Sequence, residues 1–135
     1  MKVNGQCYCG NVTYRAEIDP ERVVICHCTD CQQLSASAFR TVAFTHEDAF
    51  EASGEIREFI KTAASGNQRA QGFCPECGSA IYATSVGAGP KVYGLRVGTL
   101  AQRAELAPKR QVWRDSALAW VDSVADLPSV PGQPT

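Results

Sequence analysis

The stretch Gln6-Cys7-Tyr8-Cys9-Gly10-Asn11-Val12-Thr13-Tyr14 alternates around a Gly-Asn pair. Glycine and asparagine readily adopt the backbone angles of a two-residue hairpin turn, and alternating side chains on both sides are typical of paired strands. The stretch therefore predicts a β-hairpin whose turn lies near Cys9-Gly10-Asn11. This hairpin also carries two of the seven cysteines of the chain.

A second pair of cysteines lies far along the chain, in Cys74-Pro75-Glu76-Cys77-Gly78. A C-x-x-C turn brings two sulfurs to one ion, and the following glycine lets the backbone turn an N–H toward a thiolate. Zn²⁺ in structural sites takes four ligands, which are often all thiolates. We therefore predict a structural zinc site built from Cys7, Cys9, Cys74 and Cys77. The alternative is two unrelated pairs, one of them a redox dithiol.

The other three cysteines fall within Cys26-His27-Cys28-Thr29-Asp30-Cys31. Three protein ligands and one open position are the pattern of catalytic zinc. An ion held by three thiolates is a weak Lewis acid, better suited to binding a thiol or hydroxyl than to making a strong hydroxide nucleophile. Cys26, Cys28 and Cys31 are therefore the predicted catalytic site.

Other residues in and beside the two motifs leave alternatives open. His27 could close the second site as a fourth ligand, but on a strand end we expect it to point away from its neighbours. Asp30 is either a proton relay or a solvated turn residue. Gln32 and Ser79 could contact a ligand, cap a turn or bond a zinc-bound sulfur.

Composition predicts an ordinary globular domain. The 135 residues are 44% hydrophobic and carry a net charge of -1, which gives no general attraction to nucleic acid or anionic lipid. The start has no apolar run typical of a signal peptide, and no stretch is long and apolar enough for a membrane span. We expect one domain over residues 1–126, a Pro-rich tail over 127–135, and a cytoplasmic location in which cysteines bind metal rather than form disulfides.

Short β-rich segments at close spacing predict a mostly β fold. Gly98–Leu106 is expected to contain a helical turn, Cys28–Leu34 to open a short helix, and His46–Phe50 to form a turn. The expected strands, besides the first hairpin, are Val23–Cys26, Phe39–Thr45, Glu55–Thr62, Gln68–Phe73, Ala80–Thr84, Lys91–Val97 and Gln111–Trp113.

Three motifs together resemble the glutathione-dependent formaldehyde-activating enzyme family, which also contains the centromere protein V relatives. They are G-x-C-x-C-G-x-V-x-Y (Gly5–Tyr14), C-H-C-x-x-C-Q (Cys26–Gln32) and F-C-x-x-C-G-S (Phe73–Ser79). The resemblance implies a β-tent of curved antiparallel sheets stapled by zinc, with two zinc ions per chain. One ion is held by Cys7, Cys9, Cys74 and Cys77, and the other by Cys26, Cys28 and Cys31. It also implies a carbon–sulfur lyase that condenses formaldehyde with glutathione to S-(hydroxymethyl)glutathione.

The mechanistic hypothesis is that the zinc at Cys26, Cys28 and Cys31 binds the substrate thiol as thiolate, which then attacks a carbonyl carbon. A lyase for a different thiol adduct and a non-catalytic zinc-stabilised binding module remain the alternatives. Glutathione carries two carboxylates, so its site should offer cationic side chains. The candidates, most of which we expect to be solvated surface charges, are Arg40, Arg96, Lys109, Arg110 and Arg114.

Overall fold

The computed structural model describes residues 1–134 as a mostly β protein with two sheets, which confirms the predicted fold class. The smaller sheet has the order β1 (Lys2–Gln6), β2 (Thr13–Glu17) and β5 (Phe50–Ser53), all antiparallel. The predicted first hairpin is β1 and β2, with Gln6 opposite Thr13 and the first two cysteines in the connecting turn. Strand β5 is an element that the sequence patterns did not predict.

The larger sheet has seven strands, in the order β10, β3, β4, β9, β8, β7 and β6. All neighbours are antiparallel except β10, which runs parallel to β3. The bounds, all within a few residues of the predicted segments, are β3 (Val24–Cys26), β4 (Arg40–His46), β6 (Arg57–Thr62), β7 (Gln68–Phe73), β8 (Ala80–Ser85), β9 (Val92–Arg96) and β10 (Arg110–Val112).

Helical structure is confined to the connections and the C-terminal part. The one α-helix of the described residues, α1 (Thr29–Ser35), forms where the Cys28–Leu34 motif predicted it. Two predicted turns are confirmed as 3-10 helices at Glu47–Ala49 and within Gly98–Leu106. The others are Pro20–Arg22, Val97–Thr99, Arg114–Ser116 and Ala119–Asp126. None of the helices among residues 1–134 is long and apolar enough to cross a membrane.

The hydrophobic core lies between the two sheets. In β1 and β2 every second residue is buried, so one face of the small sheet covers the core and the other faces solvent. Residues of β4, β8 and β9 complete the core from the large sheet. The buried members include Val3, Tyr14, Ala16, Ala43, Ile81, Tyr82 and Leu95.

Polar contacts also join the small sheet, near the N-terminus, to the connection between β9 and β10. The backbone N–H of Asn4 donates to Gln102 Oε1 (3.0 Å), and Gln102 Nε2 donates back to Asn4 Oδ1 (2.8 Å). Gly5 forms a bridge to buried Leu100 next to them. These contacts fix the first hairpin, and with it the first cysteine pair, against the segment that follows β9.

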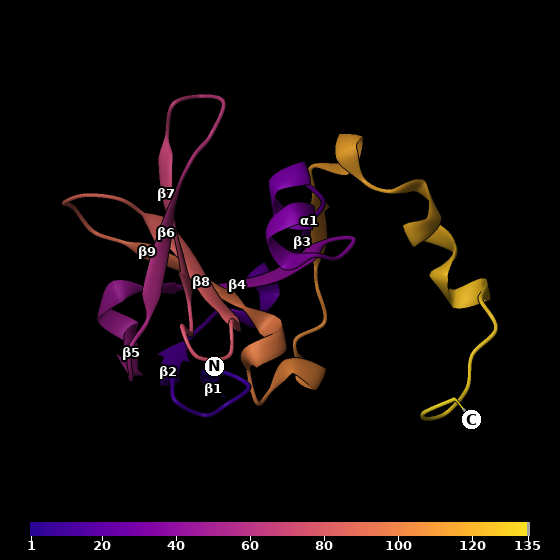
Figure 1. The fold of residues 1–135 in the computed structure, drawn as a ribbon, viewed down its shortest axis with the longest axis horizontal. Coiled ribbons are helices and arrows are strands. Elements are labelled where there is room, and N and C mark those ends of the chain that lie inside the picture. The colour runs from indigo at the N-terminus through magenta and orange to yellow at the C-terminus, as the bar shows by residue number, and fades with distance from the viewer. Residues whose placement is uncertain (135) are drawn as a thin grey trace.

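Beyond β10 the chain passes beside α1 and then extends away from both sheets (Figure 1). The segment is more helical than expected, since two 3-10 helices precede the predicted Pro-rich tail. The predicted boundary at residue 126 coincides with the end of the second of these helices, but the division into domain and tail stays a prediction. Thr135 of that tail lies outside the described residues.

Gly72, the last residue but one of β7, gives a test of the packing that positions the second cysteine pair. The Tyr82 ring lies over Gly72, where an added Cβ would come within 2.5 Å of it, and the Tyr82 hydroxyl donates to Glu58 (2.9 Å). We expect Gly72→Ala to displace the ring and lower the free energy of unfolding by about 1–3 kcal/mol, as over-packing does. Urea unfolding measures the change.

Gly98→Ala is the matched control, because nothing lies within 4 Å of the added Cβ at that position. We expect its stability to stay within about 0.5 kcal/mol of the parent. Equal stabilities of the two variants would contradict the described packing of Tyr82 over β7.

Candidate metal centres

Two groups of cysteines come together in the structure, and they are the two groups that the sequence predicted. Within each group all sulfur atoms lie within 4.8 Å of one another. One group contains Cys7, Cys9, Cys74 and Cys77, and the other contains Cys26, Cys28 and Cys31. All seven are free thiols, so neither group is a disulfide, and both groups could hold metal ions.

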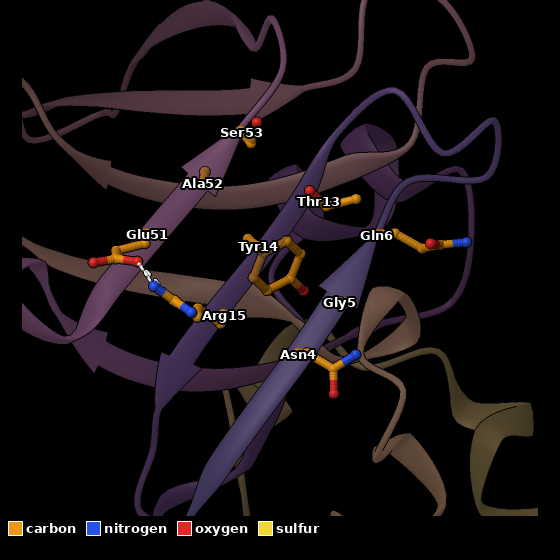
Figure 2. A pocket seen from close by; sticks show the side chains of 9 residues that line it. All are labelled: Asn4, Gly5, Gln6, Thr13, Tyr14, Arg15, Glu51, Ala52 and Ser53. Carbon is orange, nitrogen blue, oxygen red and sulfur yellow. Dashed lines mark hydrogen bonds and ion pairs between the residues drawn. The ribbon is translucent and has the colours of Figure 1, made fainter.

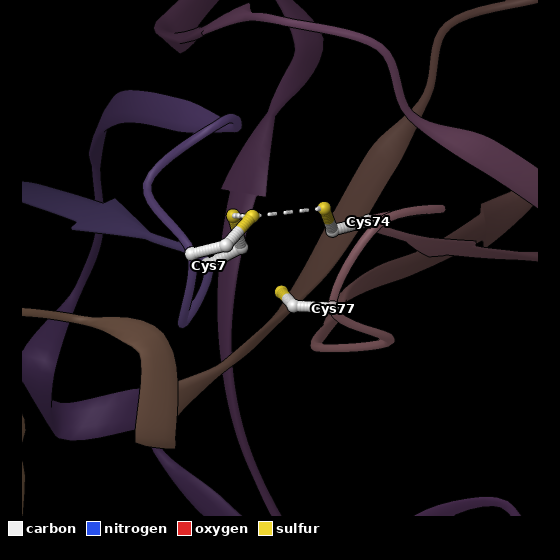
Figure 3. Close-up of side chains that lie close together, drawn as sticks. Cys7, Cys74 and Cys77 are labelled. Carbon is white, nitrogen blue, oxygen red and sulfur yellow. Dashed lines mark hydrogen bonds between the residues drawn. The ribbon is translucent and has the colours of Figure 1, made fainter.

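The four-cysteine group joins two turns that are far apart in the sequence. Figure 3 shows Cys7 on the turn after β1 and Cys74 and Cys77 on the turn between β7 and β8, with their sulfurs pointing toward one another. Cys7 and Cys74 are fully buried, whereas Cys9 is exposed, so the group lies at the edge of the core.

The sulfur spacing in this group fits a tetrahedral ion. The Sγ atoms of Cys7 and Cys9 are 3.6 Å apart, and those of Cys9 and Cys74 are 3.8 Å apart. A tetrahedron of sulfurs at the zinc–sulfur distance of about 2.3 Å has edges of about 3.8 Å. The donor set therefore fits zinc in both chemistry and spacing.

Backbone and hydroxyl groups surround these sulfurs as they do in metal knuckles. The backbone N–H of Val12 donates to Cys7 Sγ (3.2 Å). The Ser79 hydroxyl accepts from the backbone N–H of Tyr8 (2.9 Å) and donates to Cys77 Sγ (3.3 Å). That hydrogen bond lowers the pKa of the Cys77 thiol to about 5. Of the alternatives for Ser79, the structure supports a bond to a ligand sulfur.

The three-cysteine group is built where β3 ends and α1 begins. Cys26 is the last residue of β3, Cys28 is the N-cap of α1, and Cys31 lies in its first turn. Cys28 Sγ accepts the backbone N–H of Cys31 (3.2 Å), which is the usual role of an N-cap side chain. The sequence therefore uses one cysteine both to start the helix and to face its two neighbours.

The charges within this group show why it needs a cation. A hydrogen bond from the Cys31 thiol lowers the pKa of Cys26 to about 5, and the same contact raises the pKa of Cys31. Cys26 therefore forms a thiolate readily, while repulsion between the sulfurs holds the proton on Cys31. A bound metal ion would replace thiol protons, so the donor set fits a divalent cation such as zinc.

His27 points away from the three sulfurs, as the alternation of the strand end predicted. Its side chain is fully buried, its Nε2 is 2.7 Å from Gln111 Oε1, and its ring packs edge-on against Phe39. It does not belong to the group of metal-ligating atoms. Among residues 1–134, this group therefore contains three cysteines and no fourth His, Cys, Asp or Glu side chain.

Neighbouring polar residues hold α1 in place. Gln32 Nε2 donates to the backbone oxygens of His27 (2.8 Å) and Ser116 (2.9 Å), so one side chain joins the helix to β3 and to the C-terminal segment. Asp30, 51% exposed, forms an ion pair with Lys61 of β6 (2.7 Å). Gln32 is thus a positioning residue, and Asp30 ties the helix to the far edge of the large sheet.

Sequence reasoning did not place any cationic side chain near these cysteines, but the structure does. Arg40 and Arg96 are buried beside the three-cysteine group, which corrects the expectation that they are surface charges. Lys109, Arg110 and Arg114 are exposed, as expected. No short motif could reveal this difference, because it depends on the pairing of three strands.

A separate hollow lies on the small sheet, away from both cysteine groups. It is lined by Gly5, Tyr14, Arg15 and Glu51, among others, and Figure 2 shows the Arg15–Glu51 ion pair across its rim. The positive charge of Arg15 is balanced by the negative charge of Glu51. None of the residues that line the hollow is a cysteine.

The comparisons agree with these groups. The model of the family described as glutathione-dependent formaldehyde-activating enzyme matches residues 2–116, which include all seven cysteines. No protein with a curated description matches the chain. A crystal structure of a Rhodobacter sphaeroides protein matches with a TM-score of 0.61 at 18% identity, over 81% of this chain and 99% of that one, and supports the fold.

Gln32 offers a test of how α1 is held. We expect Gln32→Ala to lower the free energy of unfolding by about 1–3 kcal/mol, because it leaves two backbone oxygens without a donor. Hydrogen exchange should also become faster at the amides of α1 and of residues 114–117. Urea unfolding and exchange measured by mass spectrometry provide the two readouts.

Gln33→Ala serves as the control on the same helix, since the Gln33 side chain is exposed and makes no hydrogen bond in the described residues. Its stability should change by less than about 0.5 kcal/mol. If both substitutions had the same small effect, Gln32 would not hold the helix.

Proposed function

Because the chain belongs to the glutathione-dependent formaldehyde-activating enzyme family, we propose that it is a zinc-dependent carbon–sulfur lyase acting on a thiol–aldehyde adduct. The preferred reaction is the condensation of glutathione with formaldehyde to S-(hydroxymethyl)glutathione. The observation that carries the proposal is the three-cysteine group at the start of α1, which has no fourth protein ligand among residues 1–134. His27, the nearest candidate, is bonded elsewhere.

We assign different roles to the two groups. Cys7, Cys9, Cys74 and Cys77 hold a structural zinc, since four thiolates close the coordination shell. Cys26, Cys28 and Cys31 hold the second, catalytic zinc, which when bound would lower the pKa of a substrate thiol at its open position. A cytoplasmic location, where free thiols persist, fits both roles.

The bond changes of the proposed reaction are simple. The thiol loses its proton, its sulfur forms a bond to the carbonyl carbon, and the carbonyl π electrons move to oxygen. That oxygen takes up a proton, so atoms and charge balance without an oxidant or reductant. The protein has to hold the thiol, keep the three cysteines deprotonated and keep α1 fixed, which are the tasks of the residues described above.

The reaction itself can be tested on the zinc-loaded protein with ¹³C-formaldehyde and glutathione. The rate of exchange between hydrated formaldehyde and the adduct, measured by NMR, should rise above the rate without protein. No acceleration, at two bound zinc ions per chain, would contradict the proposal. It would leave a lyase for a different thiol adduct, tested with other thiols and aldehydes, or a binding module.

Serine substitution separates catalysis from folding at the second group. Cys28→Ser keeps an oxygen that can cap α1, because serine is a favoured N-cap residue, but it removes a thiolate ligand. We expect it to lower kcat/KM by at least about 100-fold with an unchanged circular dichroism spectrum, as loss of an essential group does. Full turnover by this variant, or by Cys28→Ala, would refute the mechanism.

Serine substitution at the first group should act on folding instead. Metal binding at structural thiolate sites contributes on the order of 10 kcal/mol to folding. We therefore expect Cys77→Ser to misfold or to lose its cooperative unfolding transition and one of two zinc ions. Cys31→Ser is the matched comparison: it should also lose one zinc ion but unfold cooperatively. A fully folded Cys77→Ser protein would contradict the structural role.

A further inference from the structure

Strand pairing brings two arginines and a ligand cysteine to one face of the large sheet. Arg40 of β4 lies directly opposite Cys26 of β3, and Arg96 of β9 lies opposite Val42, two residues after Arg40. Directly opposed residues of antiparallel strands have Cβ atoms only about 5 Å apart and point to the same side. The guanidinium groups of Arg40 and Arg96 therefore lie next to the three-cysteine group on the same face of the sheet.

Gln71 of β7 holds these two guanidinium groups together. Its Oε1 accepts from Arg40 Nη1 (3.2 Å) and from Arg96 Nη2 (3.0 Å). Each guanidinium has five N–H donors, and each uses one of them in a side-chain hydrogen bond to the described residues. Arg96 Nε is buried and has no acceptor. Most of the donors of this pair are therefore free to bind an anion.

The pair is buried without a carboxylate partner. Arg40 is 7% exposed and Arg96 9% exposed, and no carboxylate of residues 1–134 forms an ion pair with either. Buried charges in proteins are normally paired, because an isolated charge costs several kcal/mol to remove from water. Two cations that share one neutral amide oxygen are thus an arrangement that an anion would stabilise.

The cysteines supply part of the missing negative charge. Burial lowers the pKa of Arg40, and the thiolates of Cys31, Cys28 and Cys26 act in the opposite direction. Burial and the charge of Arg40 lower the pKa of Arg96 to about 9, so Arg96 remains protonated at neutral pH.

A count of charges shows that the cysteines do not balance this face. Three thiolates around a divalent ion leave one negative charge against the two arginines. Arg69, which also repels Arg96, adds a further positive charge. The neighbouring Lys61 is already paired with Asp30. A thiolate and one carboxylate of the same ligand would bring this part of the protein to neutrality.

We propose that Arg40 and Arg96, held together by Gln71, form a binding site for a carboxylate of the thiol substrate. The inference rests on the proposed function and adds the substrate class to it: thiols that carry a carboxylate. Guanidinium and carboxylate form strong paired hydrogen bonds, which give orientation as well as affinity. The arginines thereby position the sulfur over the three-cysteine group and select against neutral thiols.

The test compares two thiols of equal length on the full chain loaded with Co²⁺ in place of zinc. The probes are 3-mercaptopropionate and 3-mercaptopropan-1-ol, and thiolate binding is followed by the change in the visible absorption of Co²⁺. We expect the carboxylate thiol to bind about 10- to 100-fold more tightly, the ratio given by one or two charge-assisted hydrogen bonds. Equal affinities would overturn the inference.

Substitution of the arginines tests whether they cause the difference in affinity between the two thiols. In Arg96→Gln and Arg40→Gln the preference should fall to about three-fold or less, because the affinity for 3-mercaptopropionate falls much more than the affinity for 3-mercaptopropan-1-ol. Arg15→Gln, at a largely exposed arginine of the small sheet, should keep the full preference. If Arg96→Gln weakened both thiols equally, the arginines would only balance the charge of the cysteines, and the inference would be wrong.

A third probe, propionate, separates this inference from the proposed function. It should shift the NMR signal of the Arg96 Nε–H group, assigned by its absence in Arg96→Gln. If propionate shifts the signal but neither thiol changes the Co²⁺ spectrum, the carboxylate site stands and the proposed thiol chemistry fails. If both thiols bind equally and propionate causes no shift, the carboxylate site fails and the thiol chemistry stands.

Discussion

The contact between the first hairpin and the β7–β8 turn is the constraint on which the rest of the structure depends. Cys9 and Cys74 are 65 positions apart in the chain, yet their sulfurs lie 3.8 Å from each other. Cys7 and Cys74, both buried, continue the core into this contact. Since the hairpin belongs to the small sheet and the turn to the large one, the four sulfurs fix the two sheets relative to each other.

The second cysteine group depends on this arrangement without sharing its role. It sits at the other side of the large sheet, on a strand end and the first turn of α1, and the sheet continues from it through Arg40 and Arg96. The four-cysteine group offers four sulfurs, enough to close the coordination shell of one zinc ion, whereas the three-cysteine group offers three.

The two cysteine groups and most of the strands could be predicted from the sequence, because each depends on a pattern of neighbouring residues. Each metal-binding motif spans only a few residues, as C-x-C, C-x-x-C and C-H-C-x-x-C do. Most strands show alternation of apolar and polar residues or β-branched runs. Strand β5, only four residues long, has no such pattern and was missed. The burial of Arg40 and Arg96 could not be predicted either. It arises from the registers of β3, β4 and β9 and from Gln71 on β7, and no single segment contains that information.

The distance along the chain between Asn4 and Gln102 has a consequence for how the protein is made. These residues are 98 positions apart, and closing so long a loop costs entropy before any contact is gained. The N-terminal strand pair cannot complete its contacts until nearly the whole domain has left the ribosome. Folds dominated by such distant contacts form slowly. The newly made chain therefore spends time with its thiols exposed, before the two sheets close around the four-cysteine group.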